Sequence, residues 1–172
     1  PGGFRVTADG VFYAGDDGEA RPVCSPLTIL ARTRDDKGGN WGLLVEFDDP
    51  DGAKKRLNIP ASAMAGEFGR EVLAPLVNMG LRLAGSRSGR NTRNDLQSYL
   101  QGYDSSDRAR LVTRLGWHGD AYLLPDQQIG ASTEHLHFYE ADKNLQQISK
   151  AGTLEQWQQQ IGTLCVGNHR LA

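Results

Sequence analysis

The sequence predicts an α+β fold: an antiparallel β meander in the first third, then mixed helices and a central β-hairpin, and a closing helix at the C-terminus. In the first third, short apolar segments are separated by turns rich in Asp and Gly, a pattern typical of antiparallel strands. Beyond it, apolar residues recur at three- and four-residue intervals, which indicates helices with one buried face. Gly116 and Gly119 lie between two apolar stretches, which predicts a hairpin there.

The length of 172 residues is enough for one domain with a sizeable core. We expect a single domain over residues 1–172, with a possible subdivision into a β-rich part (1–60) and an α+β part (61–172). The chain has no initiator methionine, and it stops at residues 168–172 directly after a predicted helix. We therefore expect both ends to be cuts in a longer protein.

Charge and cysteine content limit the classes of function. The formal net charge of -2 and the pI near 6.1 exclude a globally basic nucleic-acid binder, but not a local basic face. No apolar run reaches the roughly 18 residues of a membrane span, and no secretory signal pattern is visible. Cys24 and Cys165 are far apart in the sequence, so we expect both to be reduced and buried, in a cytoplasmic protein.

The strands of the first third are each bounded by turn residues. Phe4–Thr7 and Val11–Tyr13 would form a hairpin through the favoured turn at residues 8–10. The other expected strands are Leu27–Thr33, Trp41–Phe47 and Lys54–Ile59, separated by turns at 35–40 and 48–52. The second of these turns resembles half a calcium loop, but it lacks the glutamate of the twelfth position, so turn chemistry explains it.

Helices are expected in the middle of the chain. Pro60–Ala65 would be one helical turn, and Glu71–Met79 a longer helix with Pro75 in its first turn and Gly80 after its end. The buried face of the longer helix would comprise Val72, Leu73, Leu76 and Val77. Thr92–Leu100 would be a further helix, capped by Thr92, with Leu96, Tyr99 and Leu100 facing inward.

The central hairpin would pair a strand at Ala109–Leu115 with a return strand at Ala121–Leu124, through a turn at 116–119. A further strand is expected at Leu136–Tyr139. The closing helix would begin at a capping box of Thr153 and Gln156. Its apolar stripe comprises Leu154, Trp157, Ile161, Leu164 and Cys165. We expect Trp41, Trp117 and Trp157 to be core anchors, although the turn position leaves exposure of Trp117 open.

Charge is distributed unevenly along the chain. Residues 1–53 contain five basic and ten acidic residues, whereas residues 82–114 contain seven arginines and three aspartates. The segment 85–93 combines arginines with hydroxyl side chains and leads into a helix N-terminus, where phosphate groups find suitable donors. A solvated loop and an acidic protein partner are the alternatives. The candidate nucleic-acid contacts are Arg82, Arg87, Arg90, Arg93, Arg110 and Arg114.

Reactive chemistry is not visible in the residue pattern. His135 and His137 share a strand face, but no third metal ligand accompanies them. His118 next to Asp120 could be a general base and its orienting group, but no nucleophile motif accompanies the pair. The sequence also has no Gly-x-x-x-x-Gly-Lys-Ser/Thr motif. We therefore expect no catalytic residues, no metal and no cofactor.

Three groups of motifs, taken in order along the chain, resemble one family. They are Phe4–Tyr13 with Val23–Leu27; Gly116-Trp117-His118 with Leu124-Pro125-Asp126; and Trp157 with Leu164–Leu171, and the stretches Trp41–Phe47 and Asp49–Gly52 fit the same pattern. This chain is similar to the family called domain of unknown function 927, found in bacterial prophage and mobile-element proteins labelled replicative helicase or primase-helicase. The resemblance implies that a P-loop ATPase module follows in the same chain and that the parent is an oligomeric ATPase acting on DNA.

We accordingly expect a non-catalytic N-terminal domain of a helicase-like ATPase, assisting DNA engagement or subunit arrangement during replication of a phage or mobile element. DNA would be bound weakly, through its backbone, and the full-length protein could form a homo-oligomer without membrane contact. The alternative is a protein-interaction module that recruits replication partners through Trp117 and His118. A hydrolase that uses His118 and Asp120 is a third and weaker hypothesis.

Overall fold

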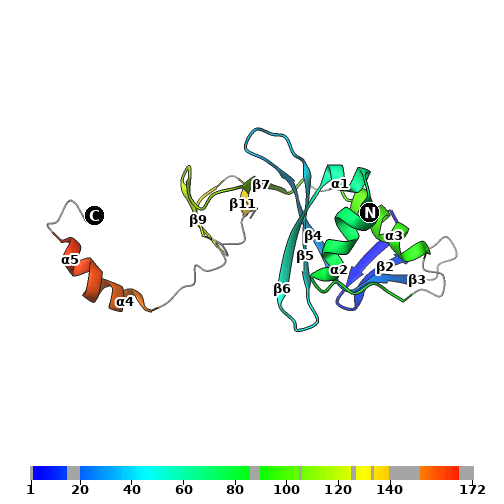
Figure 1. The fold of residues 1–172 in the computed structure, drawn as a ribbon, viewed down its shortest axis with the longest axis horizontal. Helices are drawn as coiled ribbons and strands as arrows, with labels where there is room; N and C mark the ends of the chain where they lie inside the picture. The colour runs from blue at the N-terminus through cyan, green and yellow to red at the C-terminus, as the bar shows by residue number, and fades with distance from the viewer. Residues whose placement is uncertain are drawn as a thin grey trace. The chain divides into compact units, whose positions relative to one another are not determined.

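A computed structural model describes residues 2–14, 20–85, 90–104, 106–124, 127–132, 134–139 and 152–166. The chain divides into two compact units, residues 1–139 and residues 140–172, and each is described by itself. The predicted α+β class is confirmed, with the meander at the start and a helix at the C-terminal end (Figure 1).

The first sheet is a small antiparallel meander in the order β1-β2-β3. Its strands are β1 (Phe4–Thr7), β2 (Gly10–Ala14) and β3 (Ala20–Cys24). The predicted hairpin is confirmed, with Phe4 opposite Tyr13 and Thr7 opposite Gly10. Strand β3 was not predicted, because only Val23 and Cys24 at its end are buried and Pro22 interrupts the apolar pattern.

The second sheet has five strands in the order β11-β7-β4-β5-β6. Its antiparallel part comprises β4 (Leu27–Arg34), β5 (Gly42–Asp48) and β6 (Lys54–Pro60), which confirms three predicted strands. Two strands from the second half of the chain extend it in parallel: β7 (Arg108–Val112) on β4, and β11 (His135–Phe138) on β7. The parallel extension makes β6 and β11 the two edge strands.

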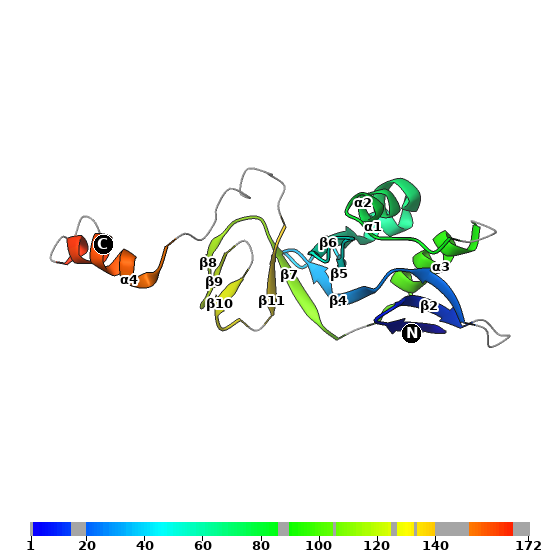
Figure 2. The same ribbon diagram turned by 90° about the horizontal axis from the view of Figure 1, so that it is seen from below.

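The helices of the first unit are α1 (Ala61–Ala65), α2 (Ala74–Asn78) and α3 (Arg90–Gln101), with a π turn η1 (Gly69–Leu73) directly before α2. Figures 1 and 2 show them on the same side of β4, β5 and β6 as the first sheet. Pro75 lies at the start of α2, as predicted, but helical backbone already begins at Gly69. Val72 and Leu76 are buried while Val77 is 44% exposed, so the buried stripe is narrower than predicted.

Helix α3 begins two residues earlier than predicted. Thr92 therefore lies within the first turn and is not the cap; its hydroxyl donates to the carbonyl of Ala84 at 3.5 Å. The three inward-facing residues are confirmed, because Leu96, Tyr99 and Leu100 are all buried. The Tyr99 hydroxyl donates to the carbonyl of Leu27 at 3.0 Å, which joins α3 to the large sheet.

The central hairpin differs from the prediction. Strand β7 ends at Val112, and Gly116, expected in the turn, begins a new strand. Gly116 has a φ of 105°, so the chain changes direction there after the bend at residues 113–114. The hairpin joins β8 (Gly116–His118) to β9 (Ala121–Leu123), and β10 (Gln128–Gly130) completes a third sheet in the order β10-β9-β8.

The two largest apolar cores join the elements of the first unit. The larger core lies between the helices, the first sheet and β4–β6, and Leu27, Phe68 and Leu76 are among its fully buried members. The smaller core joins Val112 and Leu136 of the large sheet to Ala121 and Leu123 of the third sheet. Cys24 is buried and unpaired, as predicted, and burial raises the pKa of its thiol to about 12. The side chain of Cys165 lies outside the described residues.

Within residues 152–166, the part of the second unit that the structure describes, the chain forms a helical segment made of α4 (Leu154–Trp157), a π turn η3 (Gln158–Gly162) and α5 (Thr163–Cys165). The predicted capping box is confirmed: Thr153 Oγ1 accepts from the Gln156 backbone N–H at 3.2 Å, and Gln156 Oε1 accepts from that of Thr153 at 3.0 Å. The predicted burial is wrong, since Leu154 is 69% and Trp157 51% exposed. Helical spacing shows which side chains share a face, but not whether anything covers it.

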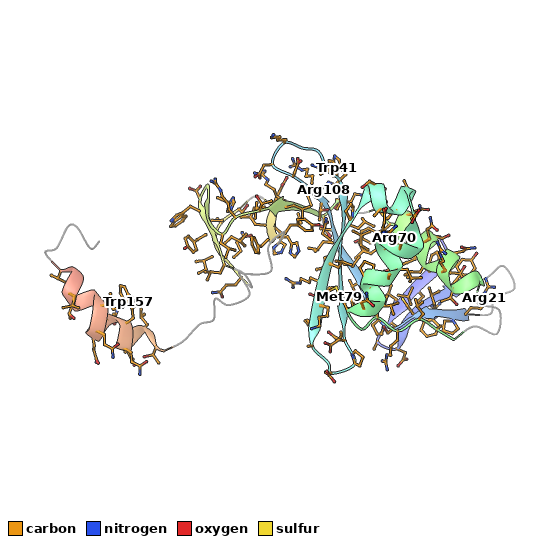
Figure 3. All side chains as sticks on the ribbon, in the orientation of Figure 1. Arg21, Trp41, Arg70, Met79, Arg108 and Trp157 are labelled. Carbon is orange, nitrogen blue, oxygen red and sulfur yellow. The ribbon has the colours of Figure 1, made fainter. Side chains whose placement is uncertain are left out.

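The other two tryptophans are also not core anchors. Trp41 is 43% exposed and Trp117 is 69% exposed. The guanidinium of Arg108 lies 5.8 Å from the centre of the Trp41 ring, so this tryptophan stacks under a cation at the surface (Figure 3). Among the helices of the described ranges, none is both long and apolar enough to cross a membrane.

Candidate nucleic-acid interface

The arginine-rich segment has well-anchored ends, although residues 86–89, including Arg87, lie outside the described residues. Before it, Arg82 and Ser25 exchange two hydrogen bonds, one from the Ser25 backbone N–H to the Arg82 carbonyl at 2.7 Å and one from the Arg82 N–H to Ser25 Oγ at 3.2 Å. After it, Thr92 bonds to the carbonyl of Ala84. The two ends of the segment are therefore held together beside the end of β3.

The arginines at this junction present their side chains to solvent where the structure describes them. Arg82 and Arg93 are exposed, and neither makes an ion pair with the described residues. The Arg93 guanidinium lies against Gly69, where an added methyl group would come within 2.9 Å of it. Arg90 is the first residue of α3. Together with Arg87, we call these four residues the arginine junction.

The other two predicted arginines lie elsewhere. Arg110, on β7, is held by carboxylates, with its Nε 3.5 Å from Glu134 Oε2 and 3.9 Å from Asp36 Oδ1. Arg34 pairs with the same Glu134. Arg114 is exposed in the bend after β7. The structure thus places the described candidates at two separate places in the fold, and Arg110 is already neutralised.

The acidic first third uses its aspartates to build turns. Asp35 accepts hydrogen bonds from the backbone of Gly39 and Lys37 and from the Asn40 side chain, and the bond from Gly39 contributes most to lowering its pKa. Asp49 accepts from the backbone of Asp51 and Ala53 in the same way. These bonds satisfy the carboxylates within their own loops, which explains the calcium-like pattern as turn chemistry.

The predicted interaction hairpin presents an aromatic pair. Trp117, on β8, meets Tyr122 of β9 edge to face, with ring centres 5.2 Å apart. His118 Nε2 donates to the carbonyl of Arg114 at 2.9 Å, so its ring is used to fix the bend before β8. Among the bonds of the described residues, none joins His118 to Asp120. The geometry therefore gives no support to the hydrolase hypothesis.

One basic cavity was missed by the sequence analysis. It has a volume of about 380 Å³ and is lined by residues from both edge strands of the large sheet, Lys54 and Arg56 on β6 and His135 and His137 on β11. Burial, together with the charges of His135 and Arg56, lowers the pKa of His137 to about 4. Strand alternation places each pair on one face, but only the sheet topology brings the pairs together. No group of three metal-ligating side chains occurs in the described part of the chain.

Comparison with known proteins identifies a family and a similar solved structure. The family described as Domain of unknown function (DUF927) matches residues 4–172. A solved structure described as "SCCmec type IV Cch - active helicase" has a TM-score of 0.59 and 17% sequence identity. The aligned region covers 96% of this chain and 30% of that one, so this chain spans less than a third of the helicase, and at this identity the likeness is one of fold. No curated protein matches the sequence.

Proposed function

Because the chain belongs to the DUF927 family, we propose that it is a non-catalytic domain of a bacterial helicase-like P-loop ATPase and that it helps the parent protein to engage DNA. The family match over residues 4–172 confirms the resemblance that the sequence motifs predicted. The likeness in fold to part of a helicase supports the same context. The 172 residues contain no phosphate-binding P-loop motif, so the nucleotide site of such a parent would lie in another part of it.

The arginine junction is the observation that carries the proposal. Arg82 and Arg93 extend into solvent from two backbone segments that Ala84 and Thr92 hold together. Exposed guanidinium groups without carboxylate partners are well suited to phosphate oxygens, to which they can offer two parallel hydrogen bonds. The first turn of α3 begins at Arg90 and adds unpaired backbone N–H groups and the positive end of the helix dipole.

Contacts of this kind predict a particular form of binding. Because counterion release dominates, binding should be weak, tolerant of sequence and steeply salt-dependent. Three or four arginines on a single strand give a slope of about -2 to -3 in a plot of log affinity against log salt concentration. The acidic first third of the sequence would repel DNA, so the strand should follow the side of the molecule that carries the junction.

Fluorescence anisotropy of labelled single and double strands against salt tests the proposal. The test variant replaces Arg87, Arg90 and Arg93 with alanine. The matched control replaces Arg5, Arg21 and Lys37, which removes the same charge from the acidic third. The test variant should flatten the salt slope and the control should keep it. Equal affinities for the wild type and the test variant, or no binding at low salt, would reject DNA contact by the junction.

The aromatic pair on the third sheet favours a second candidate function, the recruitment of a protein partner. Trp117 is 69% exposed and makes an edge-to-face contact with the ring of Tyr122. Exposed tryptophans are frequent anchors of protein interfaces. Trp117→Ala should weaken association with the purified ATPase part of the parent protein, or with other proteins of the replication apparatus, without changing DNA affinity. Unchanged association with each of them would remove this candidate.

A further inference from the structure

The basic cavity is lined by hydrogen-bond donors from both edge strands of the large sheet. Four of its lining side chains can carry a positive charge: Lys54, Arg56, His135 and His137. Two more, Gln127 and Gln128, carry amides, and apolar residues such as Leu123 and Phe138 form the remaining wall. No carboxylate belongs to the lining. A cavity with several donors and no acidic group favours an anion.

Arg56 is oriented so that part of its guanidinium is available. Its Nε donates to Glu46 Oε2 at 2.8 Å, and Glu46 lies on the neighbouring strand β5 and outside the cavity lining. The two terminal nitrogens make no contact of hydrogen-bonding length with the described residues. Glu46 thus fixes one edge of the guanidinium and leaves the other edge for a ligand, which is the arrangement needed for two parallel bonds to an anion.

Lys54 adds a second, more mobile cation. Its Nζ lies 3.4 Å from Glu46 Oε1 and 3.5 Å from Asp48 Oδ1, and its side chain is 68% exposed. These separations are long for charge-assisted hydrogen bonds, and the Lys54 side chain is exposed, so the ammonium can turn towards the cavity at small cost. Across the cavity, neither the exposed His135 nor the half-buried His137 makes a ring hydrogen bond with the described residues.

We propose that this cavity is a binding site for a doubly charged phosphate group, either the terminal phosphate of a nucleic-acid strand or that of a small phosphorylated molecule. Arg56 would hold two phosphate oxygens, Lys54 would neutralise charge at the rim, and the two histidines would donate from the opposite wall. The proposal is independent of DNA contact by the arginine junction, because the cavity uses none of the same residues.

The histidines favour a dianion over a backbone phosphodiester. Lys54 and Arg56 are offset by Glu46 and Asp48 on β5, so further positive charge has to come from His135 and His137. Burial keeps His137 neutral, and the charges of His135 and Arg56 also oppose its protonation. Glu134, next to His135 in the chain, is itself paired with Arg34 and Arg110. A bound dianion would supply the missing negative charge and draw protons onto both rings.

Sulfate is the first probe, because it stays doubly charged across the working pH range and so isolates the titration of the protein. Binding to the full chain should strengthen as the pH falls from about 8 to about 6, since the anion raises the pKa of the imidazoles, which burial lowers in His137. Arg56→Gln and Lys54→Gln should each weaken sulfate binding roughly tenfold, the cost of one charge-assisted hydrogen bond.

The matched control is Lys55→Gln. Lys55 is the next residue on β6, so its side chain leaves the opposite face of the sheet, where it pairs with Asp49 at 3.2 Å. The substitution Lys55→Gln removes the same charge from the same strand and should leave sulfate binding unchanged. If Arg56→Gln does not fold, Lys54→Gln still tests the site, because an exposed side chain can be replaced with little effect on stability.

Two further arms identify the source of the phosphate. A single strand with a 5′-phosphate is compared with the same strand carrying a 5′-hydroxyl, and a nucleoside monophosphate is titrated alone. Preference for the phosphorylated strand would assign the site to strand ends, and binding of the monophosphate alone would assign it to small molecules. Absence of sulfate binding between pH 6 and 8, equal affinities for all three glutamine variants, or loss of sulfate binding in the arginine-junction variant would overturn the assignment.

Discussion

Trp157→Ala should have almost no effect on the unfolding free energy of the chain, whereas truncation of a smaller but buried residue should lower it clearly. Trp157 is 51% exposed, and its ring lies against Gly162 of its own helical segment, so its truncation removes contacts within that segment. We expect a loss below about 1 kcal/mol, the range of surface substitutions. Truncation of a tryptophan that is anchored in a core, as the helical spacing predicts for Trp157, would cost roughly 3–5 kcal/mol.

Leu96→Ala is the matched comparison. Leu96 is fully buried on α3, so its truncation should cost about 2–5 kcal/mol, although fewer atoms are removed. Urea denaturation followed by circular dichroism measures both variants without relying on tryptophan fluorescence. A loss near 3 kcal/mol for Trp157→Ala, similar to that of Leu96→Ala, would show that the closing helix belongs to a cooperative core and would refute the reasoning from exposure.

Three further predictions concern chemistry and stability. The purified chain should not hydrolyse ATP, since it lacks a P-loop motif; turnover that survives repeated purification would contradict this. Tyr99→Phe should lower the unfolding free energy by about 1 kcal/mol, because the bond to the Leu27 carbonyl is lost in a buried position; an unchanged urea midpoint would show that the bond contributes nothing. The pKa of His137 in the folded chain is depressed to about 4, so its stabilising effect is present above the unfolded value near 6.5 and is lost as the pH falls towards 4. His137→Gln should reduce the loss of stability in that window, and identical pH profiles for the variant and the wild type would contradict the assignment.

Local signals were reliable where a strand is bounded by turn residues on both sides. The hairpin of β1 and β2 and the strands β4, β5 and β6 follow from alternation and from the Asp–Gly turns between them. The sequence could not show that β7 and β11 join this sheet in parallel, because pairing between distant segments leaves no local pattern. The strand expected at residues 109–115 ends at Val112, because the chain bends at residues 113–114.

The sequence predicted which arginines the candidate site could contain, but not which of them pair with carboxylates. Counting arginines along residues 82–114 identified the exposed Arg82 and Arg93, and it equally selected Arg110, which Glu134 occupies from a distant part of the chain. Periodicity also placed Trp157 on an apolar stripe, while its exposure depends on what lies opposite that stripe. The basic cavity could not be predicted without the sheet topology. Its two pairs of residues are far apart in the sequence and meet only because β6 and β11 are the edges of one sheet.

The order of the strands in the large sheet has a consequence for biosynthesis. Strand β4 can pair with β7 only after β7 has been synthesised. The other edge of β7 then stays unpaired until β11 has left the ribosome. During that interval a nascent chain exposes the backbone donors and acceptors of β7, which can pair with another unfinished chain. A premature stop before residue 135 would make the exposure permanent. Such fragments should therefore aggregate during translation, even though the first sheet and the helices α1, α2 and α3 are complete.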